Sequence, residues 1–275
     1  MNCKPFHTLQ EELTRAGWVV PESTYDCLSE YEKQFFDIEF TGINTIDYYQ
    51  TRLRELGFSD YTSVLDAGCG MGQWSLAMAK LNSHVTGADI NVGRLLVAKD
   101  IANTMAIKNV KFQFSGAERS PYDNESFDAV FCYGVFMFTH MPSALAEFNR
   151  VLKPGGRIYL NVNSLGWYFH LLIDRGLKKR DFTMVKASLR MLLKTWLGKK
   201  QNVMVSPKRL RKMLVQAGFR VTAIGPEGTI TAEGAPASVQ SKYPSSIYGY
   251  PAVTEVLALK MTTSAIESDN RNQSP

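Results

Sequence analysis

Cysteine is scarce in this 275-residue sequence, and no two cysteines form a short motif. The chain has no CxxC pair and no histidine cluster beside any of its four cysteines, which are Cys3, Cys27, Cys69 and Cys132. Such spacing disfavours a zinc site and a disulfide framework. We therefore expect no bound metal and a reducing compartment.

Long apolar runs are also lacking. No stretch approaches the roughly 20 apolar residues that span a bilayer, and the N-terminal segment carries charges where a signal peptide needs an apolar core. The net charge of +5 is mild, so it allows an acidic substrate or an anionic surface without requiring nucleic acid. We expect a soluble cytoplasmic protein.

Residues 1–60 have the apolar spacing of helices. Apolar residues recur every three or four positions in 24–40 and 45–58, and Gly57 suits a helix end. The pattern predicts an N-terminal helical extension over 1–60.

A regular alternation of short apolar strands and helices follows. Strands are predicted at 63–67, 84–89, 110–114, 127–132, 157–162, 220–224 and 252–261. The intervening helices are predicted at about 72–81, 91–105, 142–152 and 206–219, with "LKPGG" (152–156) as a helix stop and turn. Strands that alternate with helices form a parallel sheet covered on both faces. We predict an α/β fold over 61–261, a doubly wound, mostly parallel seven-stranded sheet with helices on both faces.

Three other segments depart from this alternation. Residues 164–205 form a helical insertion after the fifth strand, and 226–250 are a long surface loop rich in Gly, Pro, Ser and Tyr. The polar tail, 262–275, is expected to be mobile.

The insertion contains a predicted basic amphipathic helix at 180–200. Its apolar stripe consists of Phe182, Val185, Leu189, Leu192 and Trp196. Beside the stripe, basic residues recur every four positions: Lys186, Arg190 and Lys194. We favour a helix packed over the active site with a solvated basic face, and peripheral membrane contact is the alternative.

Three glycines at alternate positions follow the first predicted strand, in "VLDAGCGMGQWS". Gly68, Gly70 and Gly72 give G-x-G-x-G instead of the dinucleotide fingerprint G-x-G-x-x-G. Glycines at a strand-to-helix turn let the backbone approach a ligand closely. The preceding Asp66 is unfavourable against a pyrophosphate but suits a ligand with an ammonium and a sulfonium. A nicotinamide-dependent oxidoreductase is therefore disfavoured.

The glycine loop, its acid and the order of segments over 63–162 resemble the class I S-adenosylmethionine-dependent methyltransferases. The resemblance implies that Asp66 orients the methionine part of S-adenosyl-L-methionine and that the three glycines admit its backbone-like end. Asp89, 23 residues after Asp66, would accept the ribose hydroxyls, with Ile90 beside it. The alternative for Asp89 is a helix N-cap, a task that Asn91 could share.

The resemblance also implies an adenine side within 115–131. The family usually has an acid before the alanine of this segment, where this chain has Gly116. The adenine amine would therefore be held by Glu118, a backbone carbonyl or water. Ala117 remains a candidate for a backbone bond to the adenine ring.

Methyl transfer is an in-line displacement, so the protein mainly aligns and desolvates the reactants. In the family, the segment after the fourth strand borders the methyl group and the acceptor. Tyr133 is therefore a cofactor-binding and catalytic candidate. His140 is the candidate general base, with helix capping or packing as an equal alternative.

Three weaker assignments come from position and family analogy. Residues 136–138 (Phe-Met-Phe) could line an apolar acceptor pocket, although core packing is favoured for at least one of them. His170 is a second base candidate. Tyr48, Tyr49 and Arg52 would belong to a lid over the cofactor.

These features predict a methyltransferase for a small or medium-sized acceptor, with oxygen favoured over nitrogen. The acceptor would be a natural product, a sugar or a lipid-linked metabolite. An RNA-modifying methyltransferase is the alternative, although "CYGV" replaces the proline-tyrosine signature of base-amine methylation. A non-catalytic S-adenosylmethionine-binding protein is the other alternative. No motif specifies the acceptor or the oligomeric state.

Overall fold

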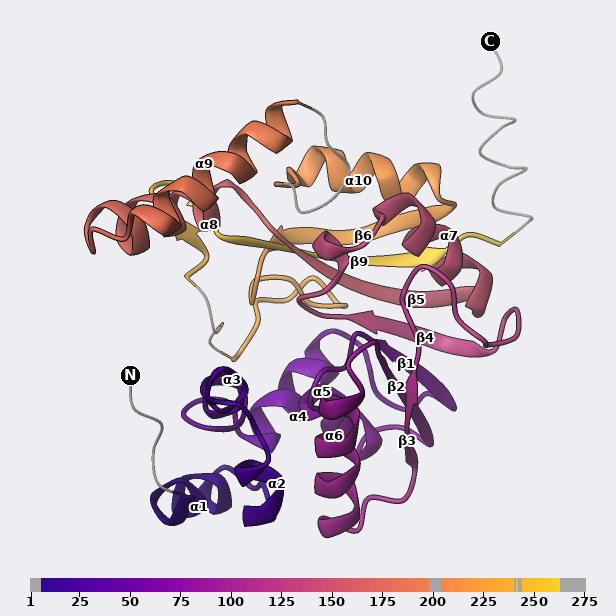
Figure 1. Ribbon diagram of the computed structural model, residues 1–275. Helices are drawn as coiled ribbons and strands as arrows, with labels where there is room; N and C mark the ends of the chain where they lie inside the picture. The colour runs from indigo at the N-terminus through magenta and orange to yellow at the C-terminus, as the bar shows by residue number, and fades with distance from the viewer. Residues whose placement is uncertain (1–5, 198–203, 240, 242–243, 263–275) are drawn as a thin grey trace. The chain divides into compact units, whose positions relative to one another are not determined.

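The computed structural model describes residues 6–197, 204–239, 241 and 244–262. The main sheet has seven strands in the order β3-β2-β1-β4-β5-β9-β6, and β7 and β8 form a separate two-stranded sheet (Figure 1). The predicted α/β class with a mostly parallel seven-stranded sheet is confirmed. The chain falls into two packing units, Met1–Gly116 and Ala117–Pro275. The predicted division at residue 60 stays a prediction.

Four helices open the first unit, as the sequence predicts for 1–60. They are α1 (Phe6–Arg15), α2 (Glu22–Asp26), α3 (Glu30–Phe40) and α4 (Ile46–Glu55). Ser29 begins α3 with a capping box, and the Thr45 side chain caps α4 by accepting the Tyr48 N–H. The helices pack through aromatic rings, including Trp18 against Phe40 with 5.0 Å between ring centroids.

The first unit also holds three parallel strands and two helices. These elements are β1 (Ser63–Ala67), α5 (Gln73–Ala79), β2 (His84–Asp89), α6 (Val92–Thr104) and β3 (Val110–Phe114). Both strand pairs are parallel, with Asp66 opposite Gly87 and Asp89 opposite Phe114. The carboxyl ends of parallel strands lie at one edge of the sheet, so Asp66 and Asp89 meet there.

The second unit contains the other four strands of the main sheet. They are β4 (Phe127–Cys132), β5 (Leu152–Asn163), β6 (Phe219–Pro226) and β9 (Val253–Lys260). β4 and β5 are parallel, whereas β9 runs antiparallel to both β5 and β6. The helix stop predicted at 152–156 is confirmed, because the preceding helix ends at Val151. The predicted turn is wrong, because this segment already belongs to β5. A register shift against β4 and a φ of +77° at Gly155 accommodate it.

The helices of the second unit lie before and after β5. They are η1 (Phe136–Phe138), α7 (Met141–Val151), α8 (Leu165–Phe169), η2 (His170–Leu177, a π-helix), α9 (Phe182–Trp196) and α10 (Pro207–Gln216). Among the described residues, no helix is long and apolar enough to cross a bilayer.

The predicted loop at 226–250 is not wholly irregular. It ends in a hairpin of β7 (Ser246–Ile247) and β8 (Tyr250–Pro251). Tyr248 and Gly249 connect the strands with φ of +52° and +77°. Positive φ at both central residues is the conformation that favours a tight hairpin.

Candidate functional site

The glycine turn after β1 is held by the backbone of β2. The N–H groups of Gly68 and Cys69 both donate to the Ala88 carbonyl, at 2.7 and 2.9 Å. The φ angles at Gly68, Gly70 and Gly72 are +86°, +55° and +86°. This left-handed backbone explains why glycine recurs at alternate positions.

Asp89 fastens the glycine turn from the end of β2. One carboxylate oxygen accepts the Gly70 N–H at 2.9 Å, and the other accepts the Asn91 N–H at 2.8 Å. The N-cap of α6 is Asn91, whose side chain accepts the Arg94 N–H. Asp89 is therefore not the helix cap, and its ribose role stays a prediction. The following Ile90 is apolar and 70% exposed.

Asp66 is the most deeply buried acid of the glycine turn, at 1% exposure. The pKa of its carboxyl is raised to about 7, mainly by burial. The hydrogen bond from Ser75 lowers this pKa, and the negative charge of Asp89 adds to the increase. The Ser75 hydroxyl donates to this carboxyl at 2.6 Å. A cationic ligand would favour the ionised form.

Cys69 lies inside the same turn and is 5% exposed. Burial raises the pKa of its thiol well above the usual value. Since the thiolate is the reactive form of cysteine, the raised pKa disfavours a nucleophilic role, and the buried side chain fills the turn.

A buried polar cluster joins α3 and α4 to the start of α5. The Gln73 amide donates to the Glu39 carboxylate at 3.2 Å, and the Tyr49 hydroxyl donates to the Glu39 carbonyl at 2.7 Å. Tyr49 and Arg52 are buried, and Arg52 pairs with Glu55 at 3.2 Å. The lid role of Tyr48, Tyr49 and Arg52 stays a prediction. The sequence carried no signal for Glu39.

In the second unit, Tyr133 lies directly after β4 and its hydroxyl donates to Glu227 at 2.6 Å. Glu227 follows β6 and is 6% exposed. The next residue after Tyr133 is held as well, because the Gly134 N–H donates to the Asn161 side chain at 2.6 Å. Sequence reasoning missed Glu227, which lies 94 residues from Tyr133.

The loop after β6 is fixed by a second buried acid. Glu255 is fully buried on β9, where its carboxylate accepts the N–H groups of Thr229 and Ile230 at 3.2 Å each. The Tyr159 hydroxyl donates to the same carboxylate at 3.0 Å. These bonds, with the Glu227 N–H on the backbone of β9, hold Glu227 in place.

His140 occupies the N-cap position of α7, but its ring makes no capping bond to the helix backbone. Ring atom Nδ1 lies 2.8 Å from the Ser143 hydroxyl. The backbone N–H of His140 donates to the Glu118 carboxylate at 2.6 Å. The base role of His140 and the adenine-side roles of Glu118 and Ala117 stay predictions.

The remaining candidates divide between core and surface. In η1, Phe136 and Met137 are buried, whereas Phe138 is 60% exposed. At least one of the three residues is therefore core, as expected. His170 lies 3.0 Å from Asp174, whose pKa is held well below its usual range by the hydrogen bond from Lys178 and further lowered by the Tyr248 hydroxyl.

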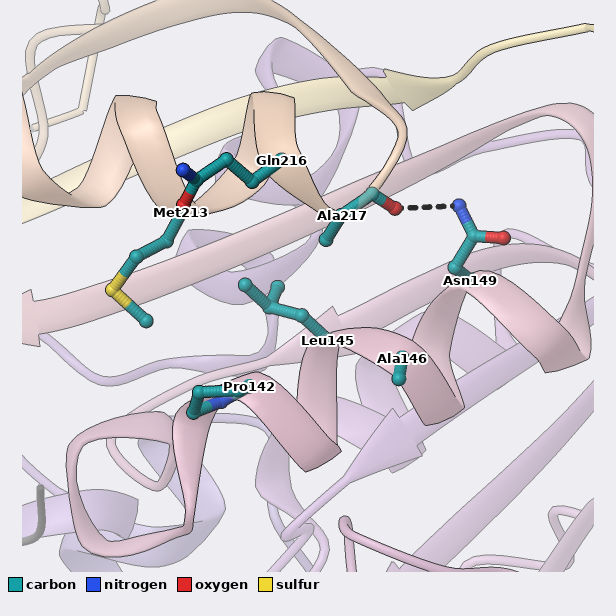
Figure 2. A pocket seen from close by; sticks show the side chains of 7 residues that line it. All are labelled: Pro142, Leu145, Ala146, Asn149, Met213, Gln216 and Ala217. Carbon is teal, nitrogen blue, oxygen red and sulfur yellow. Dashed lines mark hydrogen bonds between the residues drawn. The ribbon is translucent and has the colours of Figure 1, made fainter.

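A pocket of about 450 Å³ opens between α7 and α10 (Figure 2). The Asn149 amide donates to the Ala217 carbonyl across it at 2.9 Å. Its lining contains no titratable side chain and none of the predicted site residues. It consists of Pro142, Leu145, Ala146, Asn149, Met213, Gln216 and Ala217. We do not assign the acceptor site to this pocket.

The first unit has features that fit the methionine end of S-adenosyl-L-methionine. Among the described residues, the Gln73 side-chain oxygen is buried without a hydrogen-bond partner. The space beside Gly70 is open, because a Cβ at this position would have no neighbouring residue within 4 Å other than the two adjacent in sequence. A free buried acceptor, an uncrowded backbone and the Asp66 carboxyl suit a ligand that carries an ammonium. The described residues show no cluster of three or more metal-ligating side chains.

Part of the chain is similar to known methyltransferases. Residues 64–156 match the family described as a methyltransferase domain. Demethylmenaquinone methyltransferase from Staphylococcus aureus (strain JH9) is 36% identical over 110 residues, 38% of this chain and 45% of that protein. The chain thus spans less than half the length of the curated relatives it matches.

Solved structures share the fold at low identity. YcgJ from Bacillus subtilis has a TM-score of 0.52 and 18% identity, covering 78% of this chain and 99% of that one. A SAM-dependent methyltransferase from Aquifex aeolicus has a TM-score of 0.51 and 18% identity, covering 78% and 89%. The cyclase SpnF has a TM-score of 0.54 and 18% identity, covering 80% and 82%. At these identities the likeness concerns the fold alone.

Residues 64–156, which include the glycine turn, thus match a methyltransferase domain, and the seven-stranded sheet has the fold of a solved SAM-dependent methyltransferase. The family match and the structural neighbour described as a SAM-dependent methyltransferase support S-adenosyl-L-methionine as the cofactor.

Proposed function

We propose that the protein transfers a methyl group from S-adenosyl-L-methionine to an oxygen atom of a small or medium-sized organic acceptor. The family match supports the reaction class. The observation that carries the choice of oxygen is the hydrogen bond between Tyr133 and the buried Glu227. It fixes a phenol at the end of β4, which the family resemblance assigns to the acceptor side.

A hydroxyl acceptor must lose its proton as the new C–O bond forms, so the protein has to supply a base. The cofactor supplies the methyl group, and its C–S bond breaks as the C–O bond forms. In this proposal the His140 imidazole takes the acceptor proton. Tyr133, held by Glu227, orients the acceptor oxygen. In the first unit, Asp66 and Asp89 would hold the methionine and ribose parts of the cofactor.

The curated relatives support a small-molecule acceptor, because their printed name is that of a demethylmenaquinone methyltransferase. The match covers 38% of this chain, so their acceptor is not assigned to it. A natural product, a sugar or a lipid-linked metabolite is consistent with the proposal. An RNA-modifying enzyme and a non-catalytic binding protein are the competing proposals. The cyclase SpnF illustrates that this fold also serves other chemistry.

The proposal is tested by transferring labelled methyl from the cofactor into fractionated cell extract. Mass spectrometry of the labelled product should identify a small molecule with a methyl ether or ester. Label in RNA would overturn the acceptor class. Label on nitrogen or carbon would overturn the choice of oxygen. Cofactor binding by calorimetry without any transfer would favour the non-catalytic alternative.

A further inference from the structure

The outer face of α9 carries large apolar side chains that the protein leaves in solvent. Trp196 is 82% exposed, Phe182 76%, Leu193 53% and Leu189 52%. Spacings of three, four and seven residues place these four side chains in one row along the helix. The sequence prediction of a single packed apolar stripe is therefore wrong for Phe182, Leu189 and Trp196.

The neighbouring side of the helix attaches α9 to the second unit. Ser188 is the one buried residue of this helix, all of which is described. Val185 packs on η2 at Gly176. A Cβ added to Gly176 would lie only 2.8 Å from the Cγ2 atom of Val185. The apolar residues of α9 therefore divide between a side that packs on η2 and an adjacent side that is uncovered. Residues 198–200, the end of the predicted helix, lie outside the described part of the chain.

Positive charge accompanies the exposed row. Lys186, Arg190 and Lys194 are exposed along the adjacent side of α9, and the helix sequence contains no acidic residue. Residues 171–197 contain seven Lys and Arg against two Asp, a net charge of +5. The whole chain also has a net charge of +5. Its excess charge is thus concentrated in the segment that exposes Trp196.

We propose that α9 lies on the surface of an anionic lipid bilayer. An interfacial helix needs an apolar row that enters the headgroup region and cations that meet anionic lipids. Tryptophan suits this boundary because its ring is apolar and its N–H is polar. A lipid surface accommodates both rows at once without requiring a shaped protein pocket. The contact is peripheral and independent of the methyl acceptor.

Co-sedimentation with vesicles tests the charge requirement. The full chain should bind phosphatidylglycerol vesicles, bind phosphatidylcholine vesicles weakly, and be released by salt. The variant K186Q/R190Q/K194Q should lose about a hundredfold in affinity, roughly fivefold for each cation near the surface. The matched control K99Q/K108Q/K111Q removes three exposed lysines of the first unit and should retain binding. Equal losses in both variants would overturn the proposal.

Tryptophan fluorescence tests the apolar requirement. Trp18 and Trp74 are buried and Trp167 is half-buried, whereas Trp196 is 82% exposed. Anionic vesicles should therefore shift mainly the emission of Trp196 to shorter wavelength. W196F should lose most of the shift and still sediment, whereas F182S/W196S should sediment poorly while its melting temperature stays unchanged. An unshifted spectrum, or full vesicle binding by F182S/W196S, would contradict the proposal. A dimer in sedimentation velocity that F182S/W196S dissociates, while vesicle binding persists, would also contradict it.

Discussion

The buried carboxyl of Asp66 should make the stability of the ligand-free protein depend on pH. Asp66→Asn keeps the size of the side chain and an oxygen that can accept the Ser75 hydroxyl, but it cannot ionise. The variant therefore removes the cost of ionising a carboxyl that is 1% exposed. Asp47→Asn makes the same chemical change on an exposed residue of α4 and serves as the matched control.

The size of the effect follows from the raised pKa. Burial moves the pKa of Asp66 from 3.8 to about 7. Each unit of pKa difference between the folded and unfolded chain corresponds to about 1.36 kcal/mol of folding free energy. Between these values the folded chain holds a proton that the unfolded chain has released, so stability falls as pH rises. The stability of Asp66→Asn relative to wild type should therefore increase by about 4 kcal/mol between pH 4 and pH 8.

Urea unfolding of the ligand-free proteins at pH 4, 6 and 8 measures this difference directly. The increase should fall mainly between pH 4 and pH 7, whereas Asp47→Asn should show a much smaller change. A difference between Asp66→Asn and wild type that stays constant across this range would refute the reasoning. The cationic cofactor should bind wild type about 30-fold more tightly at pH 8 than at pH 5.5, because ionised Asp66 is the binding form.

Three other substitutions test separate parts of the site. Asp89→Ala should weaken cofactor binding by about 1–3 kcal/mol in calorimetry, and unchanged affinity would remove Asp89 from the ribose site. Gly72→Ala should lower the free energy of unfolding by more than about 1 kcal/mol, because φ is +86° and the new Cβ would lie 2.8 Å from that of Ala98; an unchanged urea midpoint would contradict this. Glu227→Gln should lower kcat at least about tenfold and spare cofactor affinity if the carboxylate positions Tyr133. An unchanged kcat would return Glu227 to a structural role.

Much of the fold was predictable because its signals are local. The strands that carry Asp66 and Asp89 near their carboxyl ends are short apolar runs between helices, and parallel pairing brings their ends to one edge of the sheet. The glycine spacing likewise reports a backbone requirement, since Gly68, Gly70 and Gly72 all have positive φ. Each of these features depends on residues that are close in sequence.

The features that escaped prediction depend on distant contacts. The hydrogen bond of Tyr133 to Glu227 joins residues 94 positions apart, and the bond of Gln73 to Glu39 joins residues 34 apart. No local pattern encodes such pairs. Helical periodicity also located the apolar row of α9 without showing which side packs, so the exposure of Trp196 was unforeseen.

The most direct test of the central claim is methyl transfer itself. Purified protein, labelled S-adenosyl-L-methionine and fractionated extract should yield a labelled small molecule methylated on oxygen, with S-adenosylhomocysteine formed in equal amount. Asp66→Asn should reduce the product by weakening cofactor binding, and Glu227→Gln should reduce it by releasing Tyr133. A protein that binds the cofactor and yields no methylated product from any fraction would contradict the account.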